Sequence, residues 1–110
     1  MKYILFITLA SALFMAGCNE KKEAGSDTLD VNAFQEKMNE TPDRTLLDVR
    51  TAPEYDAGHL ANSVLVDFQS QDFPAKIDQL RLDKSKPVFL YCAAGARSQK
   101  AAAILKEKGF

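Results

Sequence analysis

One cysteine in this sequence stands at the start of a loop that could make it a nucleophile. Cys92 follows an apolar run and is followed by four small residues and an arginine, namely Ala93, Ala94, Gly95, Ala96 and Arg97. Small side chains let backbone N–H groups turn inward around an anion, and the N-terminus of a following helix adds partial positive charge. We therefore expect the amides, the helix dipole and Arg97 to shift the Cys92 thiol toward thiolate. The alternative is a buried cysteine that fills a strand end as a small apolar residue.

The apolar spacing predicts alternating helices and strands that would position this loop. Helices are expected after Asp30, after Thr51, at 73–80 and at 97–108, and strands at 45–49, 63–66 and 87–91. Strands separated by helices need crossover connections, which indicates a small α/β domain with a parallel sheet. Ligands of such sheets bind beyond the carboxyl ends of the strands. Asp48, Arg50 and Cys92 all fall at such ends.

The same spacing predicts which side chains of the helices face inward. The expected apolar faces are Val31, Phe34 and Met38 in the first helix, Phe73, Ile77 and Leu80 in the third, and Ala101, Ile104 and Leu105 in the last. Asp30 is placed to cap the first helix, and Thr51 with Glu54 to cap the second.

The first residues indicate an export signal. A lysine at position 2 precedes an apolar run at 4–14, which is shorter than the roughly 20 residues that span a bilayer. The ending Ala16-Gly17-Cys18 resembles the lipobox of bacterial lipoproteins. That resemblance implies a signal peptide at 1–17, lipidation of Cys18, a polar tether at 18–27 and a domain at 28–110. We expect an exported protein, lipid-anchored in the cell envelope on the periplasmic side. The alternative is a plain signal peptide in which Cys18 has no role.

Composition excludes several classes of function. A chain of 110 residues is one small domain. Fourteen Lys and Arg against fifteen Asp and Glu give a net charge of −1, so no basic field attracts nucleic acid or an anionic membrane surface. Two cysteines exclude a disulfide scaffold and a zinc site built from paired CxxC ligands. The sequence carries no metal or nucleotide motif.

Three ordered motifs resemble the rhodanese family of sulfurtransferases. The likeness covers about residues 28 to 110 and is carried by Leu46-Leu47-Asp48-Val49-Arg50, by Glu54-Tyr55, Gly58-His59-Leu60 and Ser63, and by the loop from Cys92 to Arg97. The resemblance implies a rhodanese-like parallel sheet with helices on both faces. It also implies that Cys92 takes sulfane sulfur from thiosulfate or a persulfide, becomes a persulfide itself, and passes the sulfur to a thiol or protein acceptor.

The resemblance assigns roles to further residues as well. The amides from Ala93 to Arg97 hold the transferred anion, and the Arg97 side chain reinforces them. Asp48 and Arg50 fix the loop without taking part in sulfur transfer, although they could also be a surface ion pair of little energetic value. His59, the only histidine, is expected to be a hydrogen-bonded scaffold residue. No cofactor is implied, because the persulfide itself carries the sulfur.

Two other functions and one departure from the family stay open. Cysteine phosphatases and arsenate reductases have a similar loop with five residues between Cys and Arg, whereas this chain has four. A non-catalytic module could use the loop to bind an anion or a partner, with Cys92 as a thiol sensor. Rhodanese domains also continue into another strand after the last helix. We therefore expect a domain that lacks its C-terminal strand, with an unpaired edge beside the 87–91 strand.

Overall fold

The structure, a computed structural model, describes residues 28–110. The predicted signal peptide at 1–17, the lipidation residue Cys18 and the tether at 18–27 lie outside the described residues. Helices and strands alternate along the described chain in the order α1 (Val31–Glu40), β1 (Thr45–Asp48), α2 (Ala52–Ala57), β2 (Val64–Leu65), α3 (Phe73–Gln79), β3 (Val88–Tyr91) and α4 (Ala96–Glu107). None of the helices in this part is long and apolar enough to cross a membrane.

The three strands form a parallel sheet in the order β2-β1-β3, which confirms the predicted α/β class. Asp48 at the end of β1 is opposite Tyr91 at the end of β3. The chain segments that follow these two strands therefore leave the sheet side by side. Strand β2 is shorter than the predicted 63–66. It starts after Ser63 because the N–H and the hydroxyl of Ser63 both donate to the Leu60 carbonyl in a turn.

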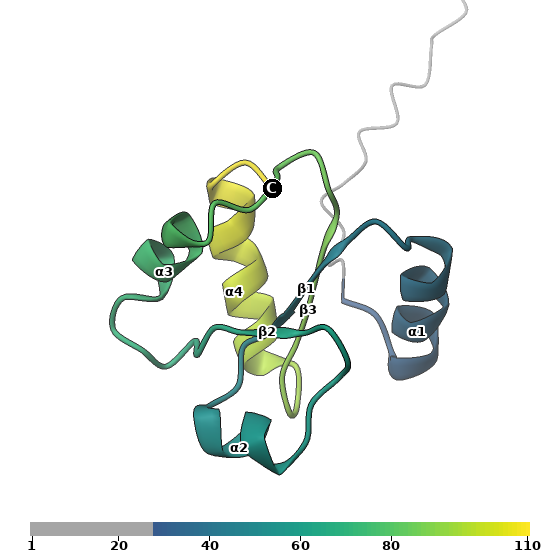
Figure 1. The fold of residues 1–110 in the computed structure, drawn as a ribbon, viewed down its shortest axis with the longest axis horizontal. Helices are drawn as coiled ribbons and strands as arrows, with labels where there is room; N and C mark the ends of the chain where they lie inside the picture. The colour runs from purple at the N-terminus through teal and green to yellow at the C-terminus, as the bar shows by residue number, and fades with distance from the viewer. Residues whose placement is uncertain (1–27) are drawn as a thin grey trace, which may run out of the picture.

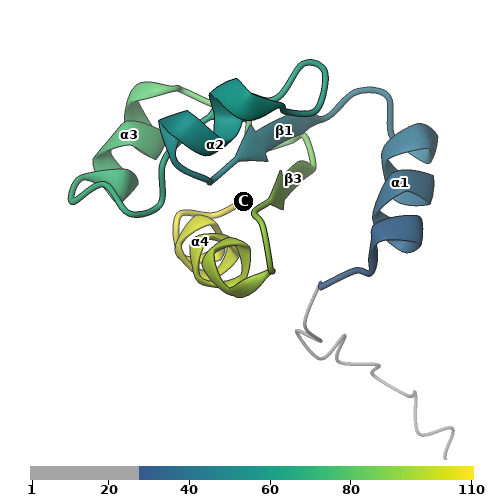
Figure 2. The ribbon, with the colours of Figure 1, turned by 90° about the horizontal axis from the view of Figure 1, so that it is seen from below.

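Helices cover both faces of the sheet, as the sequence predicts. Figure 1 shows α3 and α4 on one side of β1 and β3 and α1 on the other, and Figure 2 shows the same arrangement from below. The main core lies on the α3–α4 side. It consists of the buried residues Leu47, Val49, Val66, Phe73, Ile77, Ala101 and Leu105. On the other side, Phe34 of α1 packs edge-on against Phe89, with ring centroids 5.5 Å apart.

The predicted helix caps are present. The Asp30 carboxylate accepts a hydrogen bond from the Ala33 amide at 2.9 Å. The Glu54 carboxylate accepts from both the backbone N–H and the hydroxyl of Thr51, each at 2.8 Å. These carboxylates accept hydrogen bonds from backbone N–H groups that have no intrahelical partner at a helix N-terminus.

Two residues predicted to face the core are exposed instead. Val31 is 81% exposed, because it is the first residue of α1 and this helix meets the sheet through Phe34. Leu80 is 38% exposed, because α3 ends at Gln79 and the chain already turns away at Arg81, whose φ is 48°. The inward positions of α4 are confirmed, since Ala101 and Leu105 are buried and Ile104 packs against them.

Candidate active site

Cys92 lies between the end of β3 and the start of α4, in a loop that folds back onto its own sulfur. The backbone N–H of Gly95 donates a hydrogen bond to Cys92 Sγ at 3.0 Å. This tight turn requires a left-handed backbone at Gly95, with φ at 91°, which glycine adopts without the strain that a side chain would bring. Helix α4 begins at the next residue, Ala96, so its N-terminus is directed at the loop.

Ser98, in the first turn of α4, is the second polar group at the sulfur. Its Oγ lies 3.5 Å from Cys92 Sγ and donates to the Gly95 carbonyl at 2.9 Å. With the thiol protonated, Sγ donates to Oγ. When the thiol ionises, rotation of the hydroxyl toward the sulfur makes Ser98 a donor to the thiolate. Sequence reasoning assigned no role to Ser98. Its position as third residue of the helix, facing back over the loop, is the signal that could have found it.

The surroundings of Cys92 favour the thiolate. Partial burial raises the pKa of the thiol, but hydrogen bonds from the Ser98 side chain and from the backbone of Ser98, Ala94 and Gly95 outweigh this effect. The net result is a Cys92 pKa of about 7. About half of the cysteine is therefore ionised near neutral pH, and the thiolate is the nucleophilic form.

The Arg97 side chain points to α2. Its two terminal nitrogens donate to the two carboxylate oxygens of Glu54 at 2.8 and 2.9 Å. Hydrogen bonds from Arg97 and Thr51 hold the pKa of the Glu54 carboxyl well below its ordinary value. The pair ties the start of α4 to the start of α2. Sequence reasoning identified Glu54 only as a capping and motif residue and missed this contact, which joins residues 43 positions apart.

Asp48 and Arg50 form a bidentate ion pair at the end of β1. Arg50 Nε and Nη2 donate to the Asp48 carboxylate at distances of 2.6 to 3.1 Å, and the Arg50 backbone N–H donates at 3.0 Å. Burial raises the pKa of the Asp48 carboxyl, but the hydrogen bonds from Arg50 outweigh it and the pKa lies below its ordinary value. Asp48 is fully buried, so the pair differs from an ordinary surface ion pair. Arg50 also donates to the Gly58 carbonyl at 2.7 Å.

Tyr91 links the cysteine loop to the turn before β2. Its hydroxyl accepts from the Leu60 amide at 3.0 Å and donates to Ser63 Oγ at 3.4 Å. The Arg50 guanidinium lies 5.4 Å from the centre of its ring. Because Tyr91 directly precedes Cys92, these contacts fix the chain where the loop begins. Sequence reasoning gave Tyr91 no such role.

His59 is exposed on that turn and contacts Tyr55. Its Nδ1 is 2.9 Å from the Tyr55 carbonyl, and its ring stacks on the Tyr55 ring with centroids 3.6 Å apart. The predicted hydrogen-bonded environment of His59 is therefore present.

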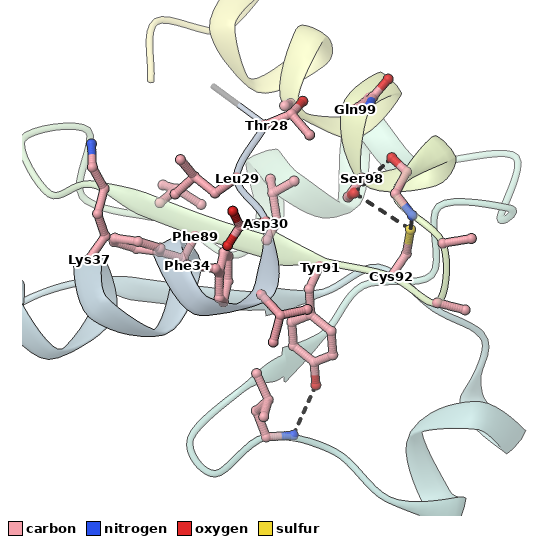
Figure 3. A pocket seen from close by; sticks show the side chains of 18 of the residues that line it. Thr28, Leu29, Asp30, Phe34, Lys37, Phe89, Tyr91, Cys92, Ser98 and Gln99 are labelled. Carbon is pink, nitrogen blue, oxygen red and sulfur yellow. Dashed lines mark hydrogen bonds between the residues drawn. The ribbon is translucent and has the colours of Figure 1, made fainter. Parts of the chain in front are cut away.

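Cys92 lines one end of a groove of about 1160 Å³. Figure 3 shows Cys92, Ser98 and Tyr91 at one end and Lys37 at the other. The lining includes Ala93 and Ala94 of the cysteine loop, the polar Ser98 and Gln99 of α4, and Leu60, whose amide binds the Tyr91 hydroxyl. Within residues 28–110, no group of three or more His, Cys, Asp or Glu side chains could hold a metal ion.

The Ser98 hydroxyl should lower the pKa of Cys92, and a pH profile tests this. We expect alkylation of wild-type Cys92 by iodoacetamide to rise with pH and to reach half of its maximum near pH 7. Ser98→Ala removes a donor to the thiolate, so its midpoint should lie at higher pH. Ser98→Thr keeps the hydroxyl and should stay close to the wild type. Mass spectrometry of the Cys92 peptide measures the rate without interference from Cys18. Equal midpoints for all three proteins would contradict this role.

The buried Asp48–Arg50 pair should make stability depend on pH. A carboxyl whose folded pKa is lowered stabilises the fold above its ordinary pKa of about 4, and this contribution is lost as pH falls through the folded pKa. At pH 7 we expect Asp48→Asn to reduce the free energy of unfolding by about 3 kcal/mol. The difference from wild type should shrink below about pH 4. Urea denaturation across this range measures it, with exposed Asp56→Asn as the matched control. A difference that is constant with pH would refute the ionic contribution.

The family of rhodanese-like domains matches residues 30–110 of this chain. A similar fold occurs in a rhodanese-like domain protein from Staphylococcus aureus, with a TM-score of 0.60, 25% identity, and coverage of 72% of this chain and 74% of that one.

Longer relatives share the same region. The tRNA uridine(34) hydroxylase of Cytophaga hutchinsonii is 40% identical over 74 residues, which is 66% of this chain and 24% of the relative. That of Yersinia enterocolitica is 36% identical over 76 residues, which is 67% of this chain and 22% of the relative. The chain thus spans about a quarter or less of these curated relatives. The match over residues 30–110, together with the shared fold, places the chain in the rhodanese-like domain family.

Proposed function

We propose that the protein is a sulfurtransferase that carries sulfane sulfur on Cys92. The observation that supports this most directly is the sulfur of Cys92 facing the Gly95 amide at 3.0 Å and the Ser98 hydroxyl at 3.5 Å, with a pKa of about 7. Such a thiol is ionised enough at neutral pH to attack and is still a good leaving group when the sulfur moves on.

The reaction consists of two exchanges at sulfur. In the first, the Cys92 thiolate attacks the outer sulfur of the donor, a new S–S bond forms, and the old bond breaks with its electron pair on the donor's leaving group. In the second, a nucleophilic acceptor attacks the outer sulfur of the Cys92 persulfide and the thiolate leaves. No general base is needed for either step. The amides from Ala93 to Arg97 hold the negative charge on the transferred sulfur.

A hydroxylase activity on tRNA has less support in this chain. The relatives of that name are far longer, and the match covers only about a quarter or less of each. The net charge of −1 also gives no basic field of the kind that holds a polyanion.

Replacement of Cys92 tests the proposal. We expect the wild type to gain one sulfur atom on Cys92 after treatment with a sulfane-sulfur donor, and to transfer it to cyanide or a thiol. Cys92→Ser should lose both the adduct and the transfer, because a serine hydroxyl is not ionised at neutral pH. Mass spectrometry and a sulfurtransferase assay measure the two steps. An adduct without turnover would favour a thiol sensor, and hydrolysis of an aryl phosphate without sulfur transfer would favour a phosphatase.

We also propose that this activity is displayed at a membrane surface in the cell envelope, tethered through Cys18. The support is the basic, apolar and small-residue order at 1–18, followed by a polar segment. Expression in a bacterial host should place the wild type in the membrane fraction. Cys18→Ser should move the protein to the soluble periplasmic fraction or leave it unprocessed, as fractionation and immunoblotting would show. Full release of the wild type as soluble protein would contradict anchoring.

A further inference from the structure

The loop that faces Cys92 presents no charged side chain to a donor. The residues between Cys92 and Arg97 are three alanines and one glycine. Arg97 ends the loop, but both of its terminal nitrogens are held by the Glu54 carboxylate at 2.8 and 2.9 Å. Because Glu54 is ionised at neutral pH, the two charges largely cancel when seen from the sulfur.

The second arginine at this end of the sheet is also neutralised. Arg50 is bound by the fully buried Asp48 carboxylate and donates to the Gly58 carbonyl. Both guanidinium groups near the carboxyl ends of β1 and β3 are therefore held in ion pairs within the chain. Neither guanidinium is therefore available to bind an anion through two parallel N–H donors while its ion pair is intact.

The lysines of the groove are remote from the sulfur. Figure 3 shows Lys37 at the opposite end of the groove from Cys92. Lys106 lies ten positions after Ala96 in α4, which is about 15 Å along the helix axis. At such distances, solvent and salt screen most of the attraction between a lysine and an anion at the cysteine. The positive potential at Cys92 thus comes mainly from amide N–H groups and the helix N-terminus, and Arg97 adds only the part of its charge that Glu54 does not cancel.

From this charge pattern we infer that the site takes its sulfur from a persulfide on an organic thiol in preference to an inorganic dianion such as thiosulfate. This inference rests on the proposed sulfurtransferase function and specifies its donor. Attack of the Cys92 thiolate on an ionised persulfide, R–S–S⁻, forms the anionic Cys92 persulfide and releases R–S⁻, so two negative charges are present throughout. Attack on thiosulfate brings three negative charges together and releases sulfite, SO₃²⁻, leaving an anionic Cys92 persulfide.

The groove wall beside the sulfur fits an organic carrier. Ala93 and Ala94, which directly follow Cys92, line the groove, and apolar contact with the carbon chain of a thiol is favourable there. A sulfonate group at the same place would meet backbone amides and alanine methyl groups, but no side-chain cation outside an ion pair. The groove volume of about 1160 Å³ is ample for a peptide-sized thiol.

The experiment compares two donors on the wild type and two variants. The donors are thiosulfate and the persulfide of 2-mercaptoethanol, a thiol with no other charged group, and the measured quantity is the ratio of their kcat/KM values, so that losses common to both donors cancel. In the wild type we expect the ratio to favour the persulfide. Ala94→Arg adds a cation to an exposed loop position and should shift the ratio toward thiosulfate by roughly tenfold. Ala94→Gln adds a side chain of similar reach without charge, and its ratio should stay near that of the wild type.

Salt dependence separates charge from shape in this test. The shift in Ala94→Arg should shrink as ionic strength rises, because an exposed charge is screened. A wild type that prefers thiosulfate, or equal shifts in the Arg and Gln variants, would overturn the inference about the donor while leaving the sulfurtransferase function intact. Absence of transfer from either donor would instead overturn the proposed function itself.

Discussion

The hydrogen bond from the Gly95 amide to the Cys92 sulfur is the interaction on which the rest of the site depends. It forms only if the chain reverses within three residues, which requires the left-handed backbone at Gly95. The same turn starts α4 at Ala96 and brings the Ser98 hydroxyl to 3.5 Å from the sulfur. One backbone conformation thus positions both donors, and those donors favour the thiolate against the effect of burial.

This conformation is held from outside the loop. Alanine side chains make no polar contacts, so the side-chain contacts that hold the two ends of the loop come from Tyr91 and Arg97. Before it, Tyr91 is bound to the turn at Leu60 and Ser63, beside the Asp48–Arg50 pair. After it, Arg97 is bound to Glu54 at the start of α2. The segments after β1 therefore act as a support for the segment after β3, which explains why motifs far apart in the sequence occur together.

The sequence predicts the fold well because apolar periodicity reflects burial directly. The parallel sheet, the caps at Asp30 and Thr51 and the inward face of α4 follow from local pattern. The position of the candidate nucleophile could be predicted for a similar reason, since Cys92 lies at a strand end before small residues. The residues that hold the two ends of the loop could not be predicted in this way. The Glu54–Arg97 pair and the Tyr91 contacts join distant positions, and neither residue spacing nor composition states which carboxylate an arginine selects. The predicted burial of Val31 and Leu80 is wrong, because periodicity does not show where a helix stops contacting the rest of the core.

The pair that fixes the loop also determines its electrostatics. A guanidinium aimed at Glu54 holds α4 in place, but it contributes little net positive potential at the sulfur because the carboxylate cancels it. The amide dipoles then supply the field, and the field of a dipole falls with distance faster than that of a charge. They stabilise charge on the Cys92 sulfur or on the atom bonded to it more than charge carried farther out on a donor. Rigidity of the loop and the proposed selectivity against multiply charged donors therefore have the same physical origin.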